Sequence, residues 1–368
     1  MSPSPTTPPS TAHAMAPADA PPRREPFGAL PDGTPVARWT LARGGTRLGV
    51  LDLGGIVQTL EVPDRQGRVA NVSLGFATAE PYMTDSPYFG ALIGRFGNRI
   101  AQGRFTLDGT THQVPVNEAP HSLHGGETGF DKRLWDVTPN GPAGLALRLT
   151  SPAGEMGFPG TLSVTVAYTL EENGAFRIDY LATTDAPTVV NLTNHTYVNL
   201  GGEGSGPVAG HRLALAASRY LPVDATLIPT GELADVRGTP FDFRAAKPIG
   251  QDLRAGHPQL LAAQGYDHCM VLDKGPTETP GHAATLHDPG SGRVMTVSTT
   301  EPGVQLYSGN FLTGSLAGPS GRAYRQGDAV CLETQHFPDA PNRPAFPSTV
   351  LRPGETFRST TVHGFTAR

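Results

Sequence analysis

Apolar and polar residues alternate along this chain in short runs, and turn-forming residues separate one run from the next. Residues 38–41, 47–53 and 56–62 are three such runs near the beginning of the chain. Alternation with a period of about two is typical of a strand that buries one face. The sequence Asp-Arg-Gln-Gly at 64–67 follows the third run and has the composition of a turn. These runs therefore predict successive antiparallel strands.

The same pattern continues to the end of the chain. Asp108 and Gly109 predict the turn of a β-hairpin over residues 104–114. Helical periodicity is scarce, and its best candidate, residues 248–262, is interrupted by Gly256 and Pro258. The further predicted strands cover residues 145–149, 162–170, 176–182, 189–192, 270–272, 293–299, 304–307 and 329–332.

The fold class follows from this succession of strands. The chain holds 45 glycines and 36 prolines, which together are 81 of 368 residues, and such frequent punctuation suits many short strands better than long helices. We therefore predict an all-β protein, a large antiparallel β-sandwich around one continuous core.

The first residues have a different composition. Residues 1–26 are dominated by Pro, Ala, Ser and Thr, and cannot bury enough apolar surface to offset the entropy of ordering. We predict a disordered tail over 1–26 and a single β-sandwich domain over 27–368. Met15 is a hypothetical alternative start that N-terminal sequencing of the native protein would test. The tail has no apolar stretch of signal-peptide length, and no run of about 20 apolar residues predicts a membrane span.

Charge and cysteine content give no support to a nucleic-acid partner, a membrane partner or a catalytic thiol. The formal net charge is -5, with 17% charged residues, which gives no reason to expect nucleic acid or an anionic membrane as a partner. Cys269 and Cys331, the two cysteines, both lie in apolar runs. Buried, reduced thiols in a cytoplasmic protein are the natural interpretation, and neither cysteine has the polar, Gly-rich setting of a nucleophile.

Polar residues gather where predicted strands end. Collected into one cleft, they would offer many hydrogen bonds to a polyhydroxylated ligand. Glu333 follows the apolar run 329–332, and a carboxylate leaving a buried strand is partly desolvated, which raises its pKa and makes it a candidate proton acceptor. A solvated glutamate at a strand end is the alternative for this residue alone. The segments in which these polar residues gather are 94–100, 121–126, 189–202, 239–243, 266–268, 302–307 and Glu333.

Each of the other candidates also has a structural alternative. His195 and His124 taken alone are typical hydrogen-bonded structural histidines, Arg99 a typical ion-pair partner, and Asp267 a typical residue at the start of a strand. His121 and His124, three residues apart, could join His195 in a zinc site. No predicted helix carries that pair, so we expect no metal.

Seven segments, in order, resemble the aldose 1-epimerase (galactose mutarotase) family. The resemblance runs from about residue 27 to near the C-terminus, and any one segment alone would be weak evidence. Members of the family adopt a many-stranded antiparallel β-sandwich, which agrees with the strand pattern. The segments are GRFGNRI at 94–100, SLHGG at 122–126 with GFDKRLW at 129–135, NLTNHTYVNLGG at 191–202, IPTGEL at 228–233 with GTPFDFR at 238–244, YDH at 266–268, EPGVQLYSGNF at 301–311, and CLETQHFPDAPNRPAFP at 331–347.

The resemblance implies roles for individual residues. Glu333 in LETQ would be the general base and His195 in TNH the general acid. Asp242 in PFD is interpreted as structural. The residues implied to hold sugar hydroxyls are His124 in LHGG, Arg99 in NRI, Asp267 in YDH and Gln305 in GVQ, with Asn98 and Tyr197 as adjacent contacts.

Two general catalysts are sufficient for the implied reaction. Interconverting α and β anomers requires a base to remove the C1 hydroxyl proton while an acid protonates the ring oxygen. The bond between C1 and O5 then breaks without any redox change, so we expect no cofactor. We expect Glu333 to be ionised and His195 protonated at the working pH, since each charge favours the other.

The sequence thus predicts an enzyme, an aldose 1-epimerase acting on free hexoses such as galactose and glucose, with a monosaccharide as its partner. A hexose-6-phosphate epimerase is an alternative that would need clustered cationic residues. A non-catalytic carbohydrate-binding β-sandwich would not need Glu333 and His195 together. A glycosidase would need two carboxylates, for which Asp267 and Glu333 could be mistaken. The preferred sugar and the choice between monomer and homodimer stay open.

Overall fold

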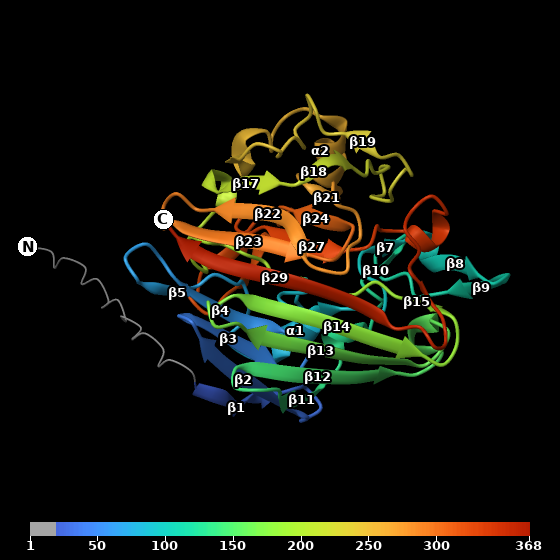
Figure 1. The fold of residues 1–368 in the computed structure, drawn as a ribbon, viewed down its shortest axis with the longest axis horizontal. Helices are drawn as coiled ribbons and strands as arrows, with labels where there is room; N and C mark the ends of the chain where they lie inside the picture. Colours follow the sequence, from blue (N-terminus) through green and yellow to red (C-terminus); the bar gives the residue numbers. More distant parts are fainter. Residues whose placement is uncertain (1–19) are drawn as a thin grey trace, which may run out of the picture.

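The computed structural model describes residues 20–368, which form antiparallel sheets stacked in layers (Figure 1). The largest sheet has nine strands in the order β11-β12-β13-β14-β29-β23-β22-β17-β20. Its strands are β11 (Asp136–Pro139), β12 (Gly144–Ser151), β13 (Leu162–Leu170), β14 (Phe176–Thr184), β29 (Phe357–Ala367), β23 (Arg293–Thr299), β22 (Gly281–His287), β17 (Arg212–Leu215) and β20 (Lys247–Pro248).

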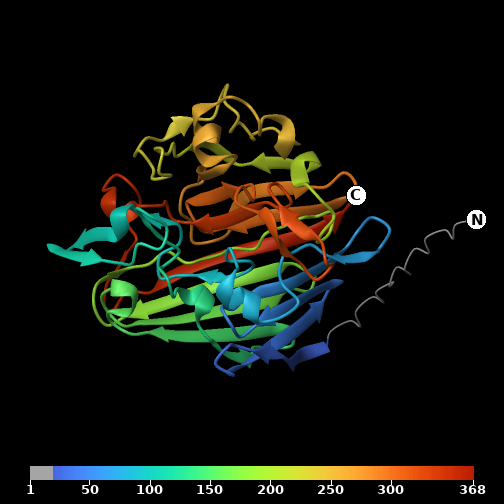
Figure 2. The same ribbon diagram turned by 180° about the vertical axis from the view of Figure 1, so that it is seen from behind.

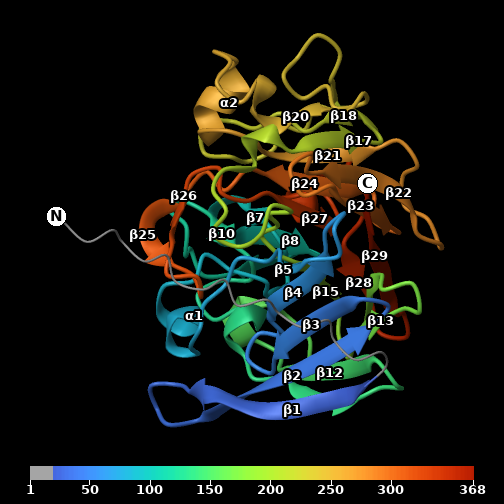
Figure 3. The ribbon, with the colours of Figure 1, turned by 90° about the vertical axis from the view of Figure 1, so that its left-hand side faces the viewer.

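Two five-stranded sheets accompany the large sheet. The first runs from β1 at the bottom of the molecule to β5 near its middle in Figure 3, and consists of β1 (Ala20–Ala29), β2 (Pro35–Arg43), β3 (Thr46–Leu51), β4 (Val57–Pro63) and β5 (Val69–Asn71). The second has the order β19-β18-β21-β24-β27, and consists of β19 (Ala234–Asp235), β18 (Ala217–Tyr220), β21 (Asp267–Leu272), β24 (Gly303–Tyr307) and β27 (Cys331–Gln335).

The described residues also form short strand pairs, two short α-helices and several 3-10 turns. The pairs are β6 (Leu92–Ile93) with β16 (Thr193–Asn194), β7 (Arg99–Ile100) with β10 (Ser122–Leu123), β8 (Arg104–Leu107) with β9 (Thr110–Gln113), β15 (Thr188–Val189) with β28 (Val350–Leu351), and β25 (Thr313–Ala317) with β26 (Ala323–Arg325). The β8–β9 hairpin projects from the side of the molecule (Figure 2). The helices are α1 (Glu80–Thr84) and α2 (Pro258–Ala263), and no helix within residues 20–368 has the length and apolar character needed to cross a bilayer.

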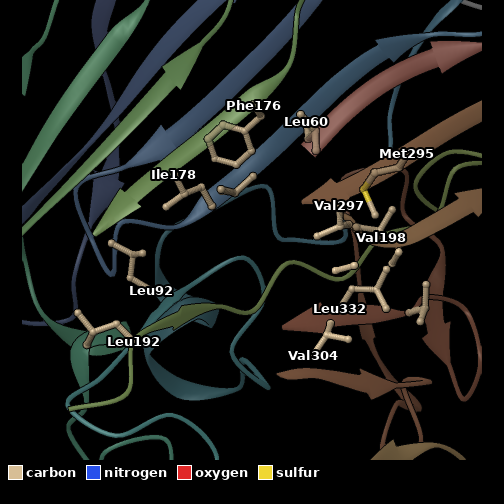
Figure 4. Packing of buried hydrophobic residues seen from close by; sticks show 14 of the residues in the cluster. Leu60, Leu92, Phe176, Ile178, Leu192, Val198, Met295, Val297, Val304 and Leu332 are labelled. Carbon is tan, nitrogen blue, oxygen red and sulfur yellow. The ribbon is translucent and has the colours of Figure 1, made fainter. Parts of the chain in front are cut away.

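Alternation along the strands builds the main core. In β13 every second residue from Leu162 to Leu170 is buried, as a strand with one face on the core requires. Each large aliphatic side chain buried in this way contributes about 1.5–3 kcal/mol relative to exposure. Figure 4 shows the core between the large sheet and the two smaller ones, where Phe176, Ile178, Met295 and Val297 lie near Leu60, Leu332 and Val304.

The predicted boundary of the N-terminal tail was wrong for residues 20–26. They belong to β1, which pairs with β2 in the register Arg24↔Trp39. As the edge strand of its sheet, β1 tolerates Pro21 and Pro22, whose missing N–H groups would break an internal strand. Glu25 also forms an ion pair of 3.3 Å with Arg38 of β2. The rest of the predicted tail lies outside the described residues.

Two other predicted elements differ from the structure. The best helical candidate, residues 248–262, contains a 3-10 turn at Ile249–Gln251 and then α2. The helix α2 starts at Pro258 because proline is accepted only in the first turn of a helix, and the side chain of His257 caps the N–H of Gln259. The predicted strand 329–332 is shifted, since β27 extends from Cys331 to Gln335 and places Glu333 in the middle of a strand.

Candidate active site

A cavity of about 230 Å³ opens beside the second five-stranded sheet. Side chains from β21, β24 and β27 form part of its wall. The rest comes from β7, β10, the segments that precede β6, β7 and β10 and follow β10 and β16, and the segment after β24. The lining residues are Pro87, Tyr88, Asn98, Arg99, Glu118, Leu123, His124, His195, Tyr197, Asp267, Tyr307, Phe311 and Glu333.

Strand register places the polar side chains of the sheet in rows. Gln305 of β24 lies opposite Glu333 of β27 on one side and Cys269 of β21 on the other. The next row consists of Asp267, Tyr307 and Cys331. Because side chains two residues apart on a strand share a face, both rows point the same way.

The strand bearing Glu333 also determines where His195 lies. The backbone groups of Val198 and Val330 exchange two hydrogen bonds, of 2.8 and 3.0 Å, which attach the segment after β16 to the start of β27. On the other side, the N–H of His195 donates to the carbonyl of Ala91 over 2.9 Å. Residues far apart in the sequence are thereby brought to one point.

At that point Oε1 of Glu333 and Nε2 of His195 are 3.6 Å apart. Both residues are buried, with exposed fractions of 2% and 4%. The separation exceeds the usual hydrogen-bond length of about 2.7–3.2 Å, so a hydroxyl group can contact both atoms at once. Among residues 20–368, Oε2 of Glu333 has no hydrogen-bond partner. The pair is therefore free to exchange protons with a ligand.

The imidazole ring of His195 is held by its neighbours. Nδ1 is 3.6 Å from Sγ of Cys331, so β27 presents a partner to each nitrogen of the ring. The ring stacks on Tyr197 with centroids 5.0 Å apart and on Tyr88 with centroids 5.9 Å apart. Tyr197 is fixed in turn because its hydroxyl donates to the carbonyl of Pro87 over 3.0 Å.

Burial determines the protonation of the pair. It raises the pKa of Glu333 well above its ordinary value, and the nearby carboxylate of Asp267 raises it further, while Arg99 acts in the opposite direction. Burial lowers the pKa of His195 to about 4. Burial therefore favours the neutral pair over the expected ionised Glu333 and protonated His195. The neutral pair differs from the ion pair only in the position of one proton.

Asp267 is anchored at both oxygens. Oδ1 accepts a hydrogen bond of 2.7 Å from Nε2 of Gln305, and Oδ2 lies 3.5 Å from Nη1 of Arg99. Gln305 is buried and contacts Asp267 without lining the cavity, so its predicted role as a direct sugar ligand is still a prediction. Burial raises the pKa of Asp267, and Arg99 and Gln305 oppose that effect.

The backbone of three cavity residues has a positive, left-handed φ angle. These residues are Tyr88, Asn98 and His124, with φ angles of 68°, 62° and 53°. Such angles are uncommon for residues with a side chain and are enriched at functional sites. Asn98 and His124 support each other, since the Asn98 N–H donates to Nδ1 of His124 over 3.1 Å and the His124 N–H donates to the Asn98 carbonyl over 3.0 Å. The aromatic ring of Tyr88 meets the His124 ring edge to face.

The hydrogen bonds of the cavity histidines show which of their nitrogens could bind a metal ion. Within residues 20–368, His124, His195 and Glu333 have potential ligand atoms within 4.8 Å of one another. However, Nδ1 of His124 accepts the Asn98 N–H, which leaves the proton on Nε2 and makes that nitrogen a hydrogen-bond donor in the neutral ring. The zinc alternative was wrong about His121, whose Nδ1 accepts from Gln102 N–H and whose Nε2 contacts Thr226.

The structure thus brings together seven of the eight predicted site residues around one cavity, with Gln305 behind Asp267. Sequence reasoning missed Tyr88, which carries no motif of its own, and Glu118, which looks like any loop glutamate. Asp242 pairs with Arg244 at 2.7 Å, away from the cavity lining, in agreement with its structural interpretation.

Comparisons with known proteins identify the family. The family model described as Aldose 1-epimerase matches residues 37–364. The chain is 45% identical to a galactose mutarotase of Rattus norvegicus, over 93% of this chain and 98% of that protein. It is 39% identical to an aldose 1-epimerase of Escherichia coli, over 92% of this chain and 97% of that protein. A crystal structure of galactose 1-epimerase from Lactobacillus acidophilus superposes with a TM-score of 0.83 at 27% identity, covering 95% and 99% of the two chains. The resemblance seen in the sequence is confirmed, and the chain belongs to the aldose 1-epimerase family.

Proposed function

We propose that this protein interconverts the α and β anomers of free neutral hexoses such as galactose and glucose. The observation that carries the proposal is the Glu333–His195 pair, 3.6 Å apart on the wall of a cavity of about 230 Å³. That volume is below the range of about 300–1,000 Å³ typical of drug-sized ligands, and suits a compact ligand such as one monosaccharide.

The proposed reaction needs one proton removed and one delivered. In the carboxylate–imidazolium form, Glu333 accepts the proton of the C1 hydroxyl while Nε2 of His195 protonates the ring oxygen O5. The bond between C1 and O5 breaks, and C1 becomes an aldehyde. Rotation about the bond between C1 and C2 presents the other face of the aldehyde, and the same two residues act in reverse to close the ring.

The low pKa of His195 assists the delivery step. An imidazolium that burial disfavours gives up its proton readily, and the raised pKa of Glu333 makes its carboxylate a stronger base. The neutral pair and the ion pair hold the same number of protons. A sugar hydroxyl placed between the two residues can therefore convert one form into the other by passing a proton between them.

Other parts of the cavity suit hydroxyl binding. His124 offers its Nε2–H, Asp267 offers a buried carboxylate, and Asn98 and Arg99 line the same wall. We infer that these groups position the sugar.

The charge of the cavity disfavours a phosphorylated substrate. Arg99 is the single Arg or Lys among the described lining residues, and its guanidinium is already paired with Glu118 and Asp267. A non-catalytic binding site would not require a buried Glu333 beside His195, since burying both groups is costly without a function.

The test is polarimetric relaxation of freshly dissolved α-D-galactose with and without the protein, with a nitrophenyl galactoside as a parallel substrate. We expect faster relaxation to the same equilibrium rotation, with no release of nitrophenol. An unchanged relaxation rate would refute the proposal, and nitrophenol release would indicate a glycosidase.

We further infer a cytoplasmic location, supported by two buried free thiols at Cys269 and Cys331. Cell fractionation tests this location, and light scattering distinguishes a monomer from a homodimer.

A further inference from the structure

Glu118 lines the cavity, and both of its carboxylate oxygens accept hydrogen bonds from the guanidinium of Arg99. Nε of Arg99 donates to Oε2 over 2.6 Å, and Nη2 donates to Oε1 over 3.0 Å. Two parallel hydrogen bonds of this kind are the strong, geometrically specific form of an Arg–carboxylate pair. Nothing in the sequence around Glu118, which lies between β9 and β10, pointed to this contact.

The pair differs from an ordinary surface salt bridge. Exposed pairs contribute little to stability, because solvent screens both charges. The Arg99 side chain is only 4% exposed, while that of Glu118 is 38% exposed and lines the cavity. The guanidinium of Arg99 is therefore desolvated, and both of its sides are already paired with carboxylates. Glu118 lies on one side, and Asp267 lies on the other, 3.5 Å from Nη1.

The charges of the cavity consequently favour one class of ligand. The described lining residues include three carboxyl groups, on Glu118, Asp267 and Glu333, against one guanidinium on Arg99. If Glu118 were replaced by a neutral glutamine, Arg99 and Asp267 would balance each other, and one of the two Arg99 N–H groups that now donate to Glu118 would be available to a ligand oxygen. Glu118 thus both adds a negative charge and occupies the group that would bind an anion.

We propose that Glu118 is a specificity-determining residue that makes the site select neutral aldoses and reject aldoses with an anionic substituent, such as hexuronates. This inference rests on the proposed anomer interconversion. It assigns to Glu118 no part in the proton transfers, which belong to Glu333 and His195.

The expected size of the effect follows from Coulomb's law. One unit charge at about 7 Å, with an effective dielectric constant of about 40 at a partly exposed site, changes the binding of a charged ligand about tenfold. A neutral hexose would feel no such change.

The test compares D-galactose with D-galacturonate, which carries a carboxylate in place of the C6 hydroxymethyl group. Polarimetry gives kcat/KM for both sugars with wild type, Glu118→Gln and Glu118→Asp. Glu118→Gln keeps the shape and one acceptor but removes the charge, and Glu118→Asp keeps the charge. The matched control is Glu127→Gln, which neutralises another exposed glutamate of the same part of the chain that does not line the cavity.

We expect the galacturonate-to-galactose ratio of kcat/KM to rise about tenfold in Glu118→Gln, and to stay within about threefold of wild type in Glu118→Asp and Glu127→Gln. A ratio in Glu118→Gln that equals the wild-type ratio would overturn the inference, as would an equal rise in Glu127→Gln. If the wild-type protein does not accelerate galactose relaxation at all, the proposed anomer interconversion is refuted. A failure of the proposed function is thus distinguished from a failure of the inference about Glu118, in which wild type is active but the ratio does not change.

Discussion

Replacing Cys331 by alanine tests how the imidazole of His195 is controlled. The thiol lies 3.6 Å from Nδ1, and β27 offers it from the same face as Glu333. Burial raises the pKa of the Cys331 thiol, and the carboxyl groups of Glu333 and Asp267 raise it further, so the sulfur stays protonated. A neutral thiol can donate to Nδ1 or accept from it, and can therefore serve His195 before and after proton transfer.

The magnitude follows from this contact. A net hydrogen bond contributes about 0.5–1.5 kcal/mol, and a buried nitrogen that loses its partner costs about 1–3 kcal/mol. If about 1 kcal/mol of this is felt in the transition state, kcat falls about fivefold in Cys331→Ala. Cys331→Ser keeps a group that donates and accepts, and should lose less activity than Cys331→Ala.

Cys269→Ala is the matched control. Cys269 is also a buried thiol, on β21 of the same sheet, where β24 separates it from β27, but it has no contact with His195. Both alanine variants should lose comparable stability, of about 1 kcal/mol in urea unfolding. The assay is the pH dependence of kcat by polarimetry, together with ¹⁵N NMR of labelled histidine, which reports the tautomer and protonation of His195. The reasoning is refuted if Cys331→Ala keeps the wild-type kcat and the wild-type His195 signals, or if Cys269→Ala loses activity to the same extent.

Three more predictions concern protonation and the support of Asp267. The acid limb of kcat/KM should lie below pH 5, because burial holds the pKa of His195 near 4, and a limb near pH 6.5 would contradict that burial effect. Stability should fall as the pH is lowered from 6.5 to 4, because burial lowers the pKa of His195, His211 and His363 to about 4 and that of His268 to about 3, so these groups bind more protons in the unfolded chain. The raised pKa values of Glu333 and Asp131, about 6 for the latter, oppose part of this fall. The upper bound for His195 is about 3 kcal/mol, and urea midpoints that do not change from pH 7 to pH 5 would argue against it. Gln305→Leu removes the 2.7 Å hydrogen bond to Asp267 and should raise KM for galactose several-fold, corresponding to about 1 kcal/mol, whereas an unchanged KM would show that Asp267 needs no such support.

Strand prediction succeeded where apolar and polar residues alternate over most of the strand. Predicted strands 162–170 and 293–299 coincide with β13 and β23. Burial alternates along the whole of β13, whereas in β23 the alternation begins only at Met295, after Arg293 and Val294, which are both buried. The chemistry of the site broke the same rule in β27. There Glu333, Thr334 and Gln335 continue the strand although all three are polar, since their backbone pairs with β24 while their side chains remain buried. The sequence pattern therefore ended this strand too early.

The site could be predicted only as a set of residues. Glu333 and His195 come from segments far apart in the chain, and the double hydrogen bond between Val198 and Val330 that brings them together has no local signal. Burial also reversed the expected charge state, because the attraction between two charges does not offset the desolvation of both. Glu118 escaped notice for a related reason, since its role depends on a guanidinium contributed by β7.

The most direct test of the central claim measures the relaxation of α-D-galactose in Glu333→Gln and His195→Asn beside wild type. General acid–base groups typically contribute about 10²–10⁴-fold each, so both variants should lose at least 100-fold in kcat while circular dichroism shows an intact β fold. A folded variant at either position that keeps near wild-type kcat would contradict the assignment of the buried pair as the proton-transfer groups.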